Sequence, residues 1–408
     1  DPNLAYIGLA GVHVSQQSRW NVTSYYVNPL LTAMGGHYES SYIEGGNAGT
    51  LQVYGNSATV LNGTISAQAM SGRHQVADAD LAVGGSFYAG QGNNNSLGSL
   101  VYSDAAFTPA GPSYVVRDEV TRLDAGFDAG SALDDVDASL SAWTQISGKD
   151  LGAGGFSSVT LVADSPAQTG SATRTPEGGE IRVEGSGLAV QPLGRIELVA
   201  ARVTIEGDLV ARAGDISVIA TGHTGVEGST LPTQADGAPV AGDISVGAGV
   251  KLDTSGVWVN DTGLSEDQIS GAATIDGGSI SLVTLQNAAL QGNRAVDTTG
   301  SIRLGEGSLL DVSSGGRVRP DGSLSQSAKG VLDGRGGDIA LQVYAINNGF
   351  VFGGEALPLP SSRPTQGQLD LGGELRGYGF AGGGRLSLRA LGIQIGGSDD
   401  SVGAGTLH

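Results

Sequence analysis

The chain has no cysteine and little positive charge. None of its 408 residues is cysteine, which excludes a disulfide scaffold, a thiolate metal site and a cysteine nucleophile. Lysine occurs only three times, and 41 acidic residues against 21 basic ones give a formal net charge of −20. A phosphate backbone would repel such a chain, so we exclude nucleic acid as a partner. The same charge suits a soluble, self-repelling extracellular surface.

Long apolar runs are also missing. No run approaches the roughly 20 residues that a membrane-spanning helix needs, so we expect no membrane-spanning segment. Glycine, by contrast, is abundant, with 69 residues, and the apolar fraction is 39%. That apolar fraction is too high for a disordered, low-complexity chain. Many turns that join short buried strands account for both numbers.

A short pattern recurs along the chain and organises most of it. A glycine turn is followed by a polar residue, an aliphatic residue, a free position and a second aliphatic residue, as in Gly337-Asp338-Ile339-Ala340-Leu341. Further copies begin at Gly49, Gly179, Gly194, Gly214, Gly242, Gly278, Gly300 and Gly384. Composition alone would produce about one or two such matches, so the pattern is an internal repeat.

The spacing within each copy predicts a β-strand. Side chains alternate between the faces of a strand, so both aliphatic residues point one way and the residue between them points the other. A lone strand of this kind buries too little to fold, whereas strands stacked about 4.8 Å apart form a continuous aliphatic ladder. Parallel crossover connections are almost always right-handed. The sequence therefore predicts an all-β fold, a right-handed parallel β-helix (a solenoid) with irregular side loops and a less regular N-terminal part.

A second phrase supports this interpretation. It begins with glycine and ends in Leu-Asp before a turn rich in Gly or Ser. Its aspartates are Asp253, Asp311, Asp333 and Asp370. Aspartate binds its own backbone at such corners, and glycine supplies the positive φ that a tight corner needs.

We divide the sequence into three regions. Residues 1–72 are a tyrosine-rich β segment with the first coils, residues 73–153 are an acidic irregular insertion or long-loop region, and residues 154–408 form the regular shaft. The middle region holds the one amphipathic helix that we expect, because apolar residues recur there at spacings of three and four behind an N-cap, Ser131. Those residues are Leu133, Val136, Leu140 and Trp143.

Long intervals between copies of the pattern predict side loops. The candidate loops are residues 221–240, 258–271 and 345–366. Loops that project from a rigid support are where specificity usually resides. We therefore expect contact surfaces there.

The sequence contains fragments of catalytic and metal-binding motifs without their full context. Asp261, Asp399, Asp400 and His223 stand in short stretches similar to fragments of pectinase motifs, but the order that would place such motifs on successive coils of one face is missing. The five histidines are scattered without a zinc motif. Turn chemistry accounts for these residues.

An acidic stretch in the middle region offers oxygen ligands. Asp134, Asp135 and Asp137 have the side chains that calcium prefers, and we interpret them as a solvated acidic turn. We predict that the chain is not an enzyme and has no catalytic residue, metal site or cofactor. The alternative, a β-helix polysaccharide lyase or hydrolase, would need Asp261, or Asp399 with Asp400, in a groove with a second carboxylate opposite.

The repeated strands and their turns resemble the filamentous-haemagglutinin-like exoproteins of Gram-negative bacteria. The similarity is clearest in GSLLDVSSGGRVRP, GVLDGRGGDIALQV and KLDTSGVWVNDTG, and it extends to EGGNAGTLQVYGNSATVLNGTISAQ. The resemblance implies a structural segment of a secreted β-helical adhesin, exported through an outer-membrane partner pore (two-partner secretion). It further implies attachment at the cell surface or in a biofilm.

The same resemblance bears on partners and on the extent of the protein. Host-cell, bacterial-cell or matrix glycans and proteins are the expected ligands, and lateral or end-to-end self-association is compatible with a shaft. Some members of the family act as stalks for contact-dependent toxin delivery, which is a further alternative. We expect the chain to be a segment of a longer protein.

Overall fold

The structure is a computed structural model in which the chain forms two compact units, residues 1–43 and 44–408. The residues it describes are 13–20, 22–26, 43–54, 59–78, 80–90, 113–128, 131, 139–140, 143–163, 179–222, 242–265, 268–271, 273–286, 288–291, 294–297, 299–345, 367–390, 392–393 and 406–407. In the first unit, β1 (His13–Gln17) and β2 (Val22–Tyr26) pair as an antiparallel hairpin, with Ser15 opposite Ser24. The tyrosine-rich stretch 21–27 was predicted as a strand and contains β2, whereas β1 was not predicted and residues 37–42 of the second expected strand lie outside the described residues.

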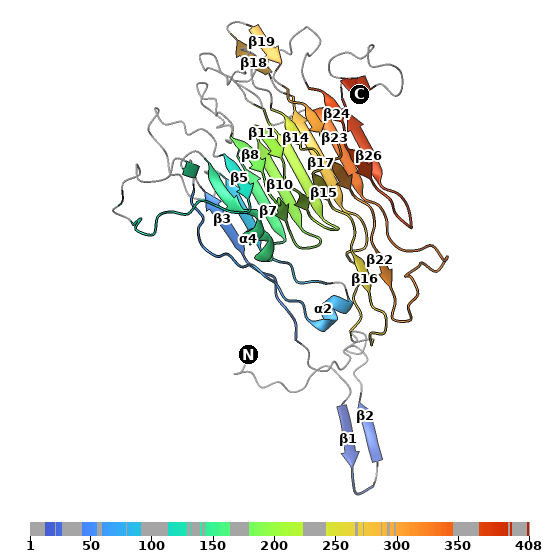
Figure 1. The fold of residues 1–408 in the computed structure, drawn as a ribbon. Helices are drawn as coiled ribbons and strands as arrows, with labels where there is room; N and C mark the ends of the chain where they lie inside the picture. The colour runs from blue at the N-terminus through green and yellow to red at the C-terminus, as the bar shows by residue number, and fades with distance from the viewer. Residues whose placement is uncertain are drawn as a thin grey trace. The chain divides into compact units, whose positions relative to one another are not determined.

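The second unit contains three large sheets whose strands all pair in parallel. The eight-stranded sheet consists of β3 (Thr50–Tyr54), β4 (Ser86–Gly90), β7 (Ser158–Val162), β10 (Arg195–Ala200), β13 (Asp215–Ala220), β17 (Ser279–Leu285), β23 (Asp338–Ala345) and β26 (Arg385–Arg389). In Figure 1 these strands follow one another across the unit in chain order. The predicted all-β fold with parallel strands is confirmed.

The other two large sheets are built from the strands between these. The nine-stranded sheet consists of β5 (Tyr114–Arg117), β6 (Thr144–Ser147), β8 (Glu180–Val183), β11 (Arg202–Ile205), β14 (Ile244–Val246), β20 (Ile302–Leu304), β24 (Leu369–Leu371), β27 (Gly392–Ile393) and β28 (Thr406–Leu407). The five-stranded sheet consists of β9 (Leu188–Ala189), β12 (Leu209–Val210), β15 (Lys251–Asp253), β21 (Leu309–Asp311) and β25 (Glu374–Arg376).

The chain visits the three sheets in a fixed order. From β8 to β26 it enters the nine-stranded sheet, then the five-stranded sheet, then the eight-stranded sheet, and each strand pairs with the strand laid down one circuit earlier. Two short sheets interrupt this order. They are the parallel pair β16 (Trp258–Asn260) with β22 (Gly316–Val318) and the antiparallel pair β18 (Ala288–Gln291) with β19 (Arg294–Asp297).

Copies of the repeated pattern pair with one another in register. In the eight-stranded sheet, Ile196 lies beside Ile216, Ile216 beside Ile280, and Ile280 beside Ile339. The copies along the chain are nevertheless divided between two sheets, since those beginning at Gly179, Gly242 and Gly300 belong to the nine-stranded sheet and the others to the eight-stranded sheet. The sequence interpretation of one ladder is therefore corrected to two. Both sheets have an inward face, so the same alternation of aliphatic and polar residues serves either.

The two aliphatic residues of each copy form the core. Along β10 and β13 buried residues alternate with more exposed ones, and Leu198, Val218, Leu282 and Leu341 are fully buried. Burial of each such side chain contributes about 1.5–3 kcal/mol relative to exposure. At the corners, the glycines that begin the second phrase, Gly249, Gly307, Gly330 and Gly367, have φ between 71° and 79°, where a side chain would be strained.

An engineered disulfide tests this register. Because the chain has no native cysteine, the introduced pair has no competing thiol. Ser217 and Ser281 occupy the free outward position of adjacent strands and are Cα partners. A Ser217→Cys, Ser281→Cys variant is expected to oxidise and to raise the free energy of unfolding by about 2 kcal/mol, since the bond closes a long loop in the unfolded chain. Urea denaturation with and without reductant measures the difference. The control is Ser217→Cys with Ala340→Cys, two strands apart, which should not cross-link.

Helices are few in the described part of the second unit. The described helices of at least one turn are α2 (Arg73–Ala77) and α4 (Gly148–Ala153), and the Ser147 side chain caps α4 by accepting a hydrogen bond from the Asp150 N–H at 3.1 Å. Neither helix was predicted from the sequence. Most of its predicted helix, residues 132–138, lies outside the described residues, as do most of the side loops 221–240 and 345–366. In the described part of the chain no helix has the length and apolarity needed to cross a membrane.

Candidate functional site

The structure places only some of the residues that the sequence singled out for chemistry. Asp261 is described, whereas His223, Asp399, Asp400 and the acidic stretch 134–137 lie outside the described residues. The Asp261 side chain is 1% exposed, and its Oδ2 lies 2.9 Å from Arg317 Nε. Its Oδ1 accepts a hydrogen bond from the Ser270 backbone N–H at 3.0 Å. With both oxygens bound inside the protein, this carboxylate has no face that a substrate can reach.

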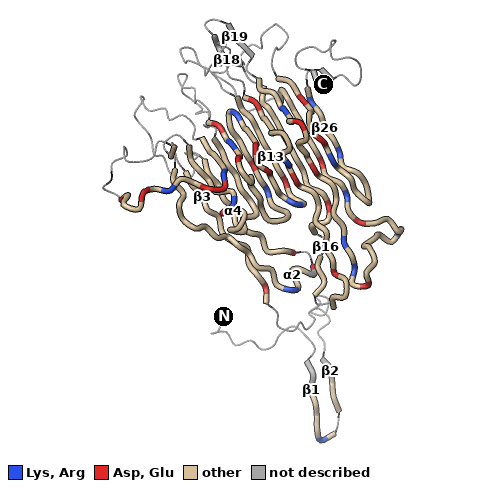
Figure 2. Tube along the Cα trace, viewed as in Figure 1, with Lys and Arg blue, Asp and Glu red and all other residues tan. Residues whose placement is uncertain are grey.

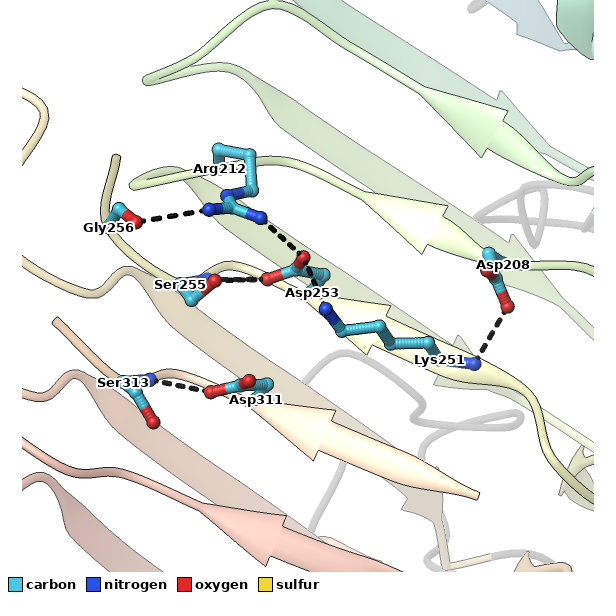
Figure 3. A network of polar contacts seen from close by, with 8 residues as sticks. All are labelled: Asp208, Arg212, Lys251, Asp253, Ser255, Gly256, Asp311 and Ser313. Atoms are coloured by element: carbon cyan, nitrogen blue, oxygen red, sulfur yellow. Dashed lines mark hydrogen bonds and ion pairs between the residues drawn. The ribbon is translucent and has the colours of Figure 1, made fainter. Parts of the chain in front are cut away.

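A second buried carboxylate, Asp253, is the last residue of β15 and stands at the corner that follows it (Figure 3). Its side chain is 4% exposed, and its Oδ2 lies 2.8 Å from Lys251 Nζ and 2.9 Å from Arg212 Nη1. Its Oδ1 accepts hydrogen bonds from the backbone N–H and the hydroxyl of Ser255. One strand along, Asp311 Oδ1 accepts from the Ser313 N–H at 3.0 Å, so the predicted aspartate turn recurs on successive strands.

The surroundings of Asp253 favour its charged form. Burial by itself would raise the pKa of this carboxyl, but the hydrogen bonds from Lys251 and Ser255 and the nearby charge of Arg212 outweigh burial, so the pKa is lowered below its usual value. Because every acceptor position of the carboxylate is directed at a neighbour in the corner, we assign Asp253 a role in holding the turn.

This lowered pKa predicts how stability depends on pH. The carboxylate of Asp253 is more stable in the folded than in the unfolded chain, so its contribution is present above about pH 4 and is lost as the pH falls through the folded pKa. An Asp253→Asn variant should be less stable at neutral pH and lose less stability than the parent between about pH 4 and 2. Urea midpoints across that range measure both slopes. Asp311→Asn changes the same corner one strand away and is the matched control; parallel curves for parent and Asp253→Asn would contradict the prediction.

Charges on the outer face of the nine-stranded sheet are arranged in opposite pairs. Arg303 contacts both Asp243 and Asp370, and Arg117 Nη2 lies 2.8 Å from Glu184 Oε2. In Figure 2, acidic and basic residues alternate over the strands. Exposed pairs of this kind contribute little to stability, about 0–1 kcal/mol each. Their mixing of signs makes this face a poor candidate for binding a charged ligand.

The short sheet β16–β22 carries a different surface, which we call the aromatic face. Trp258 is the Cα partner of Gly316, and Asn260 is the partner of Val318, so these four residues share one side of the sheet. Leu324 bridges to Val318 from the next stretch of chain and extends the same side. Trp258, Asn260 and Leu324 are exposed to solvent. The aromatic face thus combines aromatic, aliphatic and carboxamide side chains.

Phe380 completes the aromatic face from a third circuit of the chain. Its ring centroid lies 5.8 Å from that of Trp258, with an interplanar angle of 84°. Gly316 makes the contact possible, because a Cβ added there would lie 2.7 Å from Trp258 Cζ3. Trp258 remains 54% exposed and Phe380 47% exposed, so the pair is neither core nor fully solvated. We take this pair as the centre of the candidate binding surface.

The opposite side of the same short sheet is anchored by the ion pair described above. Val259 is the Cα partner of Arg317, and the Asp261 N–H donates to the Val318 carbonyl at 2.9 Å. The buried Asp261 carboxylate therefore binds β22 on the side of the sheet opposite to Trp258. Asp261, which the sequence analysis considered for catalysis, is a positioning residue of the aromatic face.

One part of the aromatic face was predicted from the sequence and another part was not. The segment 258–271 was predicted as a contact loop, and in the structure its first three residues form strand β16. Phe380 was not anticipated, because its proximity to Trp258 depends on how three circuits stack. A detectable signal was the glycine pair at positions 315 and 316, where no side chain occupies the strand position between the two rings.

Comparison with protein-family models, with curated proteins and with solved structures finds no match to this chain.

Proposed function

We propose that the chain is a structural shaft segment of a secreted bacterial filamentous adhesin, similar to the filamentous-haemagglutinin-like exoproteins. In this proposal the three parallel sheets are the walls of a right-handed β-helix. The shaft reaches the cell surface or the biofilm matrix through an outer-membrane partner pore. There it presents surfaces that attach to glycans or proteins of cells or matrix, without chemistry of its own.

One observation carries the proposal: the chain enters the three sheets in the same order and in register on each circuit from β8 to β26. Each circuit adds about 4.8 Å and buries the aliphatic ladder of the circuit before it. Length therefore grows without a new core, which suits a spacer. The absence of cysteine fits this role, because export then requires no oxidative folding step.

The alternative function, a polysaccharide lyase or hydrolase, would need two carboxylates close together, and the stacked aspartates of the corners are the nearest match. Asp253 and Asp311 are Cα partners on neighbouring strands, as carboxylates of a β-helix hydrolase could be. A hydrolase needs both groups open to the glycosidic bond. The Asp253 side chain is instead enclosed by Arg212, Lys251 and Ser255. We therefore propose attachment and not hydrolysis.

Adhesion of coated beads tests the function directly. Beads carrying the whole folded chain should adhere to a subset of bacterial and epithelial cells, whereas beads carrying the heat-denatured chain should not. The same preparation is incubated with neutral and acidic polysaccharides, and new reducing ends are measured. Failure to adhere to any cell or matrix, or release of shorter sugars that scales with protein concentration, would overturn the proposal.

A further inference from the structure

We propose that the aromatic face binds a neutral glycan, with Trp258 and Phe380 as the stacking surface and the flanking carboxamides as hydrogen-bonding groups. The proposal rests on the proposed attachment function and names the ligand class of one surface. It is drawn from the exposure, geometry and charge of the residues around β16 and β22.

The size of the exposed aromatic surface argues for a small ligand. A Trp or Phe side chain has about 150–250 Å² of surface. With Trp258 54% and Phe380 47% exposed, the pair therefore offers roughly 200 Å². A stable protein partner, or a second copy of this chain, needs about 800 Å² on each side. The two rings match a few sugar rings in size and supply roughly a quarter of the area that a protein interface needs on one side.

The polar groups on the aromatic face suit hydroxyls. Asn260 Oδ1 accepts hydrogen bonds from the N–H and hydroxyl of Thr262 at 3.1 and 2.7 Å, which fixes the amide and leaves its Nδ2 group to donate outward. Gln326, exposed and two residues after Leu324 in an extended stretch, adds a second carboxamide on the same side. Aromatic faces contact the C–H faces of a pyranose while carboxamides bind its hydroxyls.

Charge selects a neutral sugar over an acidic one. The strand positions that form the aromatic face hold no ionisable side chain among the described residues, since Arg317 lies on the opposite side and pairs with Asp261. These strand positions therefore offer no cation to a uronate, sulfate or sialate, and the Arg319 guanidinium beside Gln326 donates to the Gln326 carbonyl at 2.8 Å. The net charge of −20 adds long-range repulsion toward such groups. Binding should accordingly change little between low and high salt.

The two rings are held in place before any ligand arrives. Trp258 stands on a strand that pairs with β22, and the chain before Phe380 is fixed by a hydrogen bond from the Ser314 N–H to the Tyr378 carbonyl at 2.7 Å. The nearly perpendicular rings form a step, so that a sugar lying on one ring abuts the other. The contact between the rings limits the orientation of each, which reduces the side-chain entropy lost on binding and favours affinity.

A glycan array followed by titration tests the inference on the whole chain. Neutral hexose and N-acetylhexosamine oligosaccharides should bind, and uronate, sulfated and sialylated ones should not. Isothermal titration with the best neutral oligosaccharide should show at least a ten-fold loss of affinity in Trp258→Ala and in Phe380→Ala, with partial recovery in Trp258→Phe. The matched control is Trp20→Ala, which removes a still more exposed tryptophan (70% against 54%) from the first unit and should leave affinity unchanged.

A second variant tests the inference without removing either aromatic ring. Gly316→Val retains both aromatic residues but places a side chain where Trp258 lies, so affinity should fall at least ten-fold while the circular dichroism spectrum stays that of the parent. Equal affinity in Trp258→Ala and parent, binding of acidic glycans alone, or self-association abolished by Trp258→Ala would overturn the inference. If Trp258→Ala still adheres to cells, the aromatic face is not the attachment surface, and the proposed function stands. If neither the parent nor any variant adheres, the proposed function itself is wrong.

Discussion

Replacing Leu282 with alanine is expected to lower the free energy of unfolding by about 3–4 kcal/mol. Leu282 is 0% exposed in the middle of the eight-stranded sheet, where Val218 and Leu341 are its in-register neighbours on either side. Truncation removes the apolar contacts of the side chain and leaves a cavity that strands fixed on both sides cannot close. Urea denaturation followed by circular dichroism measures the change in midpoint.

The control for this experiment is an aliphatic residue of the strand at the end of the same sheet. Leu386 occupies the first aliphatic position of β26, which has β23 as its neighbour in the sheet, and it is 50% exposed. Leu386→Ala should cost less than about 1 kcal/mol, because little apolar surface is returned to water and the site is open to relaxation. Equal losses at the two positions would mean that the ladder does not form the core in solution.

The strands of the ladders were predictable, whereas their assignment to sheets was not. Alternation in Arg195-Ile196-Glu197-Leu198 states which side chains face inward, and the structure agrees for β10. The same alternation in Glu180-Ile181-Arg182-Val183 belongs to a different sheet. A period of two residues records only the difference between inside and outside. Which wall a strand joins depends on the bends between strands, and those are set by several residues at once.

The turns at the corners were easier to predict from the sequence than the binding surface. The aspartate turns at Asp253 and Asp311 form from local hydrogen bonds to Ser255 and Ser313, so a short sequence phrase is enough to predict them. The aromatic face depends on residues more than a hundred positions apart, as Trp258 and Phe380 show. Their contact follows from the stacking of circuits across Gly316, which no local pattern encodes.

The ion pair beneath the aromatic face is expected to be costly to break. Removal of the guanidinium in Arg317→Ala leaves the Asp261 carboxylate buried with a single remaining backbone donor, Ser270. An uncompensated buried charge of this kind costs about 3 kcal/mol or more. We therefore expect a loss of that size in the free energy of unfolding, measured by urea denaturation at neutral pH.

A double variant separates the penalty of an orphaned charge from the worth of the pair. Asp261→Asn with Arg317→Met retains the shape of both side chains and removes both charges, so its stability should lie within about 1 kcal/mol of the parent, well above Arg317→Ala. A double variant as unstable as Arg317→Ala would mean that the loss comes from the missing ion pair and not from the orphaned buried charge. Because β22 carries Arg317 on one side and Gly316 on the other, the double variant should also retain the Trp258–Phe380 contact and bind the neutral glycan as the parent does. Asp261 would then serve as a support for the aromatic face, with no part in chemistry.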